Sequence, residues 1–223
     1  MKTRKKIRFK KRYWLLIDLA VVVIIIILLL HRPKSYNPPE AIYNKQVSPY
    51  LTHNLLPQLY NGAQYGEPFE LIAVQDGINN AIASLKWPKE SEGAKFLTPV
   101  VLFVPDSIVS IGAVSIKGME FVFTIVVEPE LCEDGLLDLP ITKVKVGAMN
   151  ITPLAKIIAK RMFTKKLATA KLGTESLRAK TAAALLSGEL FEPVFKIDDK
   201  KVRIEKIAVT QGKLKIGFIP VFD

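Results

Sequence analysis

The dominant feature of the sequence is an apolar run from Tyr13 to Leu30, YWLLIDLAVVVIIIILLL. A helix rises about 1.5 Å per residue, so a run of this length just crosses the roughly 30 Å hydrocarbon core of a bilayer. Asp18 is the only charged side chain inside the run. It lies near one end, where it can approach Arg12 or water, so we expect no proton relay there. The run predicts a transmembrane helix over residues 13–30.

The flanking charges predict the orientation of this helix. Residues 1–12 carry eight Lys or Arg and no acid, and a flank of this kind stays in the cytosol. We therefore expect a basic cytoplasmic tail over 1–12 and a periplasmic C-terminal part, held at the inner membrane of a bacterial cell. A cleaved signal peptide is the rival interpretation, but HRPKSYNPPE, which follows, offers no small-residue cleavage site. An uncleaved signal anchor in a single-pass protein is favoured.

The formal net charge of +11 resembles that of a nucleic-acid-binding protein, but the N-terminal tail supplies most of it. From His31 onward, 24 basic and 20 acidic residues remain. No recognition module accompanies this small excess, so we expect no nucleic-acid partner. Cys132 is the only cysteine, which excludes an internal disulfide. It also lies too deep in the chain for lipoprotein processing.

Residues 31–67 are rich in proline and tyrosine, which predicts an extended stalk. Only YLTHNLLPQLYNG within it favours a short helix. The tyrosines either pack the stalk onto the following domain or lie at the membrane interface. An extracytoplasmic domain then occupies residues 68–223.

Residues 69–87 carry apolar side chains three and four positions apart, the pattern of an amphipathic helix. Pro88 would end this helix. Gly77 falls in its middle and lowers helix propensity, so we expect another backbone to approach closely there.

From residue 98 the apolar period changes to two, which predicts strands at 98–104, 107–117, 119–128, 136–147, 194–197 and 201–210. The alternation changes phase inside 136–148 and again inside 201–210. A β-bulge produces such a slip, since one extra residue restores the core face and bends the strand. We therefore expect a strongly curved antiparallel sheet. The alternative is that the two ends of each strand face different neighbours.

A second helix is predicted from Thr152, its expected N-cap, with Pro153 at the first helical position and Gly173 as a C-terminal cap. Its basic side chains form a candidate membrane-surface site, and the alternative is an ordinary solvated helix face. The basic residues chosen for this site are Lys156, Lys160, Arg161, Lys165 and Lys166.

Patterns that carry chemistry are missing from the sequence. Two histidines and one cysteine give no metal site, and no serine lies in a G-x-S-x-G context. No Walker or Rossmann glycine loop is present either. Residues 128–135 are acidic, but their spacing does not match an EF-hand, and they would disfavour a thiolate at Cys132. We therefore expect a protein that is not an enzyme and has no cofactor or metal.

The order of a helix, antiparallel strands, a long helix and further strands behind an anchor resembles the YpmS-like envelope proteins. More distantly, it is similar to the tubular lipid-binding superfamily. The resemblance covers residues 69–220 and departs from the family pattern at Gln75 and Gly77, where acids are expected. The matching residues are Ile78, Asn79, Val104, Pro105, Asp106, Ser107, Ile108, Gly112, Asp134, Gly135, Leu137, Val146 and Gly147.

The resemblance implies an α+β fold in which a curved antiparallel sheet packs around a long helix and encloses an apolar groove. It implies a membrane-tethered domain that binds a lipid or another acyl-bearing envelope component. The alternative is a scaffold subunit with a filled core that binds an envelope protein. Six residues would line the groove: Phe121, Phe123, Ile125, Leu154, Ile158 and Met162.

Overall fold

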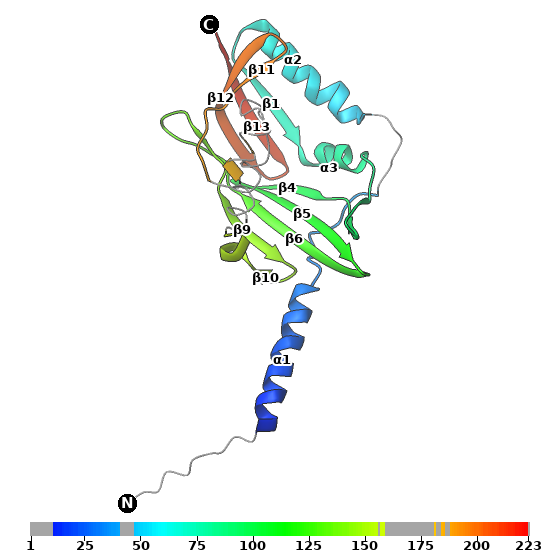
Figure 1. The fold of residues 1–223 in the computed structure, drawn as a ribbon. Coiled ribbons are helices and arrows are strands. Elements are labelled where there is room, and N and C mark those ends of the chain that lie inside the picture. The colour runs from blue at the N-terminus through cyan, green and yellow to red at the C-terminus, as the bar shows by residue number, and fades with distance from the viewer. Residues whose placement is uncertain are drawn as a thin grey trace, which may run out of the picture.

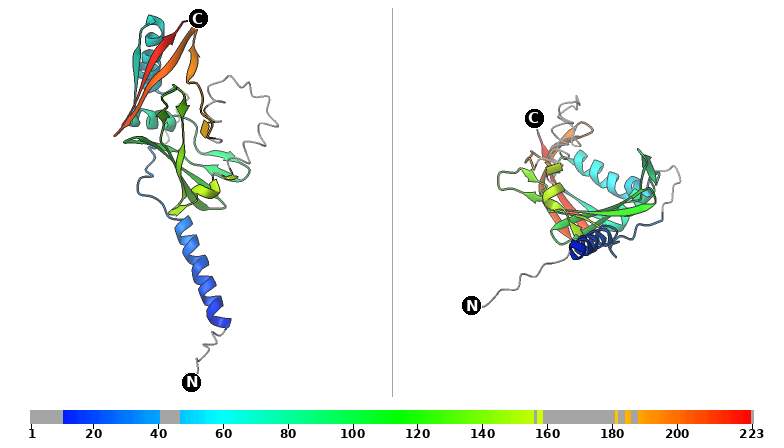
Figure 2. Two further views of the ribbon diagram at one scale, coloured as in Figure 1. Left: turned by 90° about the vertical axis from the view of Figure 1, so that its left-hand side faces the viewer. Right: turned by 60° about the horizontal axis from the view of Figure 1, so that its bottom comes forward.

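The computed structural model describes residues 11–40, 47–155, 157–158, 181, 184–185 and 188–222. Over these residues the chain has an α+β fold with antiparallel sheets, as the sequence predicts. Helix α1 (Lys11–Leu29) leads into a body made of two main sheets and two short helices (Figure 1). Figure 2 shows α1 leaving the body at the end opposite the C-terminus. Among the residues described, no helix combines the length and the apolar character needed to cross a bilayer.

The first sheet has four strands in the order β1-β13-β12-β11. They span Phe69–Val74 (β1), Val194–Ile197 (β11), Lys200–Thr210 (β12) and Lys213–Val221 (β13). Its inner face carries a core that includes Leu71, Val202, Ile204 and Phe218. The pairing joins the first strand of the body to the last strand of the chain.

The second sheet runs in the order β10-β9-β6-β5-β3-β2, and β4 also pairs with β5. Its bounds are Lys89–Ser91 (β2), Ala94–Phe96 (β3), Val100–Val104 (β4), Ser107–Ile116 (β5), Met119–Val127 (β6), Ile141–Val146 (β9) and Met149–Asn150 (β10). A small separate pair joins β7 (Glu130–Leu131) to β8 (Leu137–Asp138). The predicted strands are confirmed, except that Leu139 and Pro140 divide the expected strand 136–147.

Both predicted bulges are present. The pairing of β12 with β13 shifts between Ile204 and Lys206, which leaves Glu205 as the extra residue. The pairing of β6 with β9 shifts so that Val126 faces Lys143 while Val127 faces Ile141. In each case the phase slip of the sequence marks the position at which the ladder is interrupted.

The prediction of a helix over 69–87 is wrong for its first third. Residues 69–74 form β1, and only Gln75–Ala83 forms a helix, α3. Phe69, Leu71 and Ala73 also fit a period of two, and their side chains face the core because β1 pairs with β13 residue by residue. The short apolar segment fits both periods, and the distant partner strand decides between them.

The segment expected as an extended stalk contributes a helix to the core. A π-helical turn, Leu51–Leu55, continues into α2, Leu56–Tyr65, which ends at Gly66 in a left-handed conformation with φ 69°. Ala63 is buried against the first sheet, and Leu55 and Leu59 pack beside it. The short helix suggested by the sequence is therefore confirmed and extends to Tyr65.

Two tyrosines pack this segment onto the body. Tyr36 is 3% exposed, and its hydroxyl donates to the Thr98 carbonyl oxygen at 3.0 Å. The Tyr50 hydroxyl accepts a hydrogen bond from the Val74 N–H at 2.7 Å. A Cβ at Gly77 would overlap the Tyr50 ring. Gly77 is therefore required by the approach of a side chain and not, as expected, by another backbone.

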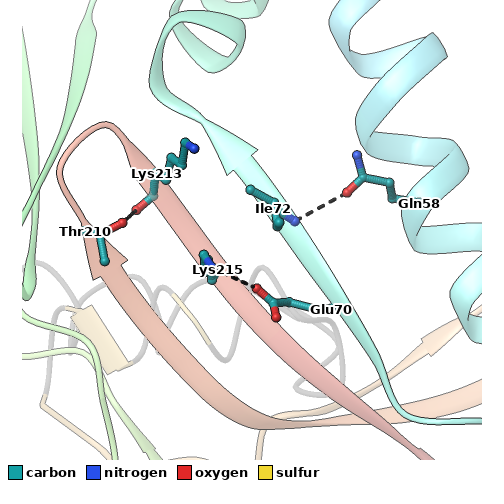
Figure 3. Close-up of polar contacts among 6 residues, drawn as sticks. All are labelled: Gln58, Glu70, Ile72, Thr210, Lys213 and Lys215. Atoms are coloured by element: carbon teal, nitrogen blue, oxygen red, sulfur yellow. Dashed lines mark hydrogen bonds and ion pairs between the residues drawn. The ribbon is translucent and has the colours of Figure 1, made fainter.

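Polar side chains of the short helices form hydrogen bonds with backbone groups at the edges of strands. The Asn79 amide both donates to the Val101 carbonyl and accepts from the Val101 N–H, each at 2.8 Å, while Gln75 Oε1 accepts from the Phe103 N–H at 2.9 Å. On β1, the Ile72 N–H donates to Gln58 Oε1 at 3.4 Å (Figure 3). Helices α2 and α3 therefore occupy the positions that further strands would take.

The helix predicted from Thr152 is described only at 152–155 and 157–158, with positions 181, 184 and 185 farther along the chain. Met162, Gly173 and the basic residues Lys156, Lys160, Arg161, Lys165 and Lys166 lie outside the described residues. Thr152 is not the N-cap: the Ile151 carbonyl accepts the first helical hydrogen bond, from Ala155, and Asn150 Oδ1 accepts the Thr152 N–H. The Thr152 hydroxyl instead accepts the Val144 N–H at 2.9 Å, because this strand edge would otherwise lack a partner.

Candidate functional site

The candidate site is the face of the second sheet that carries Phe121, Phe123 and Ile125. Residues directly opposite one another in an antiparallel pair share a face. Across β5, these three residues face Val114, Gly112 and Ser110. Across β9, Phe123 faces Val146 and Ile125 faces Val144. The shared face is therefore apolar over three neighbouring strands, with Ser110 as its only polar side chain among these residues.

The two faces of this sheet differ in exposure. The opposite face carries Ile111, Ala113 and Val122, exposed by 1%, 2% and 2%, and Tyr36 packs against them. On the candidate face, Phe123 and Ile125 are each 37% exposed. Phe121 is half-buried, and Val144 and Val146 are buried. The candidate face thus keeps accessible aromatic and aliphatic surface along β6.

Gly112 leaves room beside the Phe123 ring. A Cβ built at Gly112 would meet only the Pro99 Cβ, at 3.9 Å. Its backbone is not in the left-handed region, so neither strain nor lack of space explains a glycine here. The position instead widens the candidate face at its centre, where a larger side chain would fill the space next to Phe123.

Leu154 and Ile158 lie on the helical segment that starts beside this sheet. The Thr152 hydroxyl and the Val144 N–H share a hydrogen bond, and the Ile151 N–H donates to the Val144 carbonyl at 2.9 Å. Val144 is the residue paired with Ile125. Leu154 is 55% exposed and Ile158 46% exposed. The structure therefore brings the start of the helix to β9, and Met162, the sixth predicted lining residue, lies outside the described part.

The chemistry available on this face is that of dispersion contacts and apolar burial. Each methylene that such a face removes from water contributes about 0.8 kcal/mol, so apolar burial is the interaction that its side chains offer. Among the described residues, no group of His, Cys, Asp and Glu could hold a metal ion.

The end of α1 is hydrogen-bonded to the same sheet, a contact that no pattern in the sequence predicts. The Ala148 N–H donates to the Leu28 carbonyl at 2.8 Å, and the Gly147 N–H donates to the Val122 carbonyl at 2.7 Å. A Cβ at Gly147, where φ is 57°, would overlap the Leu28 and Leu29 carbonyl oxygens. A glycine after a strand was the only available signal, and it does not identify the partner.

Arg32 extends this attachment just beyond α1. Its guanidinium lies 3.7 Å from Glu120 Oε1 and 5.1 Å from the centre of the Tyr36 ring. Burial raises the pKa of the Tyr36 hydroxyl, the Glu120 carboxylate raises it further, and Arg32 lowers it. The neutral hydroxyl that donates to Thr98 is therefore the favoured form.

Cys132 lies in the acidic loop between β7 and β8. Burial of the thiol raises its pKa, and the carboxylates of Asp134, Asp138 and Glu130 raise it further. The prediction that this loop disfavours a thiolate is confirmed, so the residue has none of the features of an activated nucleophile.

No model of a known protein family matches this sequence, and no curated protein matches it either.

Proposed function

We propose that this protein is a single-pass membrane protein whose extracytoplasmic domain binds a lipid, or another acyl-bearing component of the cell envelope, on the candidate face. The first support is α1. Its side chains are apolar and mostly exposed along the helix, for example Trp14 by 61%, Leu19 by 61% and Ile27 by 63%. A helix with this much exposed apolar surface is expected to lie in an apolar environment such as a bilayer. The basic tail before it favours a cytosolic N-terminus.

The observation that carries the lipid proposal is the contrast between the two faces of the second sheet. One face is closed by Tyr36 and its neighbours, while Phe123 and Ile125 remain accessible beside the space at Gly112. Burying roughly ten methylenes there would contribute about 8 kcal/mol before the costs of binding.

The finer architecture also belongs to this proposal. In the resemblance to tubular lipid-binding proteins, a curved sheet wraps a long helix around an apolar groove. The two bulges favour curvature of the strands, since a bulge bends and twists the strand that contains it. The helix that starts at Thr152 would then close the groove, with Leu154, Ile158 and Met162 toward the acyl chain. Lys156, Lys160, Arg161, Lys165 and Lys166 would face anionic headgroups.

Native mass spectrometry of the full chain, purified in a mild detergent, tests lipid binding. We expect wild type to retain lipid and Gly112→Leu to retain at least ten-fold less, because the added side chain fills the space beside Phe123. Thr210→Leu, which adds a similar side chain on an exposed position of β12, is the matched control. Lipid that only surrounds α1 is lost equally from both variants or from neither.

A second variant separates blocked binding from misfolding. Ile125→Gln removes apolar character at a side chain that is 37% exposed, so we expect an unchanged melting temperature together with reduced lipid retention. Equal retention by wild type, Gly112→Leu and Ile125→Gln would refute the lipid proposal. A lipid-free mass with a tightly bound envelope protein would support a scaffold role instead.

A further inference from the structure

Two exposed apolar segments lie at the end of the body from which α1 leaves. The first is the tip of the β5–β6 hairpin, where Ile116 and Met119 pair across the Lys117-Gly118 turn and are 42% and 49% exposed. The second is the helical turn after β10, where Leu154, Ile157 and Ile158 are 55%, 52% and 46% exposed. Figure 1 shows β10 and the joined ends of β5 and β6 at the margin next to α1.

Contacts to α1 and the residues just after it fix the position of both segments. Arg32, close behind the end of α1, forms its ion pair with Glu120, the neighbour of Met119. Ala148, whose N–H binds the Leu28 carbonyl, directly precedes β10 and the Thr152 turn. If α1 spans the bilayer, Leu28 lies at the outer interface. Both apolar segments then lie at the level of the lipid headgroups.

The charges around these segments fit such a position. Lys117 is exposed at the tip of the hairpin, and the Arg32 side chain is 57% exposed. Basic side chains near an anionic membrane surface are attracted to it, and their aliphatic stems can lie along apolar surface. Glu120, the nearby acid, is paired with Arg32, so it repels anionic lipid headgroups less than a free carboxylate would.

We infer that these two apolar segments insert into the outer leaflet and hold the domain against the membrane surface. We call this contact with the membrane the seat. The inference rests on the proposed membrane span and deepens it, since it names the lipid bilayer as the partner of this end of the domain. The seat brings the candidate face to the bilayer, because Met119 continues the line of Phe121, Phe123 and Ile125 along β6. An acyl chain could then pass to this face without crossing water, and Leu154 and Ile158 would contact it at the bilayer surface, where it enters the groove.

Single-tryptophan variants of the full chain test the seat in vesicles of phosphatidylcholine and phosphatidylglycerol that carry brominated acyl chains. Met119→Trp and Ile157→Trp are made with Trp14 and Trp87 replaced by Phe. We expect bromines near the headgroups to quench both at least two-fold more strongly than they quench Thr210→Trp, which lies in the first sheet. Quenching of Met119→Trp and Ile157→Trp that is no stronger than that of Thr210→Trp would overturn the inference.

The variant that keeps only Trp14 reports on the anchor itself. Trp14 quenched while Met119→Trp and Ile157→Trp are not would leave the membrane span in place and refute only the seat. Absence of quenching at Trp14 would refute the span and the seat together. Lipid retention at Gly112 is measured separately, so its failure is distinguishable from both outcomes.

Polar substitutions in one segment supply a second test, in which the probe lies in the other segment. We expect Leu154→Asn with Ile157→Asn to reduce the quenching of Met119→Trp at least two-fold, because loss of one inserted segment weakens the other. Leu190→Asn changes a side chain that is 45% exposed outside both segments, and it should have no effect. Far-UV circular dichroism of each variant checks that the fold is retained.

Discussion

At the scale of single residues, Asn79 shows how one side chain can replace a strand. Its amide satisfies both the N–H and the carbonyl of Val101, and the side chain is 8% exposed. A buried amide placed this way has both of its polar groups paired, as burial requires. The edge of β4 is thereby closed, and α3 is fixed in one register against it.

We expect Asn79→Ala to lower the free energy of unfolding by about 1–3 kcal/mol, because two backbone groups of Val101 lose their partner. Urea denaturation followed by circular dichroism measures the change. Asn80→Ala is the matched control on the same helix, since Asn80 is exposed. Similar effects of the two variants would contradict the role given to Asn79.

At the scale of elements, local pattern predicted β4, β5, β6, β9, β11 and β12, but it did not predict β1, β2, β3 or β13. The alternation in β5 and β6 depends only on neighbours along the chain, and so do the phase slips that mark Glu205 and the β9 bulge. Residues 69–74 satisfied both a helical and a strand period, and their state depends on β13, at the other end of the chain. The sequence could not supply that information.

In the candidate site, too, some features follow from the local pattern and others depend on contacts with distant parts of the chain. Phe121, Phe123 and Ile125 were predictable because alternation assigns them to one face. The exposure of that face depends on Tyr36, which closes the opposite one from a segment far earlier in the chain. The attachment of Ala148 to Leu28 is equally non-local. A period along the chain carries no information about such contacts.

The packing of α3 against the preceding helical segment gives a second prediction. We expect Gly77→Ala to lower the free energy of unfolding by about 1–3 kcal/mol, because the new methyl group overlaps the Tyr50 ring. The loss should shrink in a Tyr50→Ala background, where the overlap is absent. Gly112→Ala, which meets no close atom, is the control for a glycine replaced without a clash. An equal loss in both backgrounds would contradict this explanation.

At the scale of the whole molecule, the joint between α1 and the body sets how the two parts are held. Gly147 allows the β9–β10 turn to approach the last carbonyls of α1, and Arg32 and Tyr36 secure the residues that follow. The body is therefore attached at more than the covalent link. Its orientation relative to the helix axis follows from these contacts.

We expect Gly147→Ala to open this joint and to increase the rate of tryptic cleavage after Lys34 roughly ten-fold, since local opening controls access to the protease. Gly118→Ala is the matched control: its φ of 84° gives similar backbone strain, but no atom lies near the added methyl. Cleavage timed by gel electrophoresis measures the difference. Equal rates for the two variants would show that the close approach at Gly147 does not hold the joint.

The pairing of β1 with β13 has a consequence for how the protein is made. Lys213–Val221 lies between Phe69–Val74 and Lys200–Thr210, so the first sheet lacks this inner strand until residues 213–221 have been synthesised. Until then, the edges of Phe69–Val74 and Lys200–Thr210 that pair with this strand remain unpaired and expose apolar side chains, which favours chaperone binding or aggregation. A frameshift or nonsense mutation just before codon 213 would therefore leave Phe69–Val74 and Lys200–Thr210 without the strand that joins them.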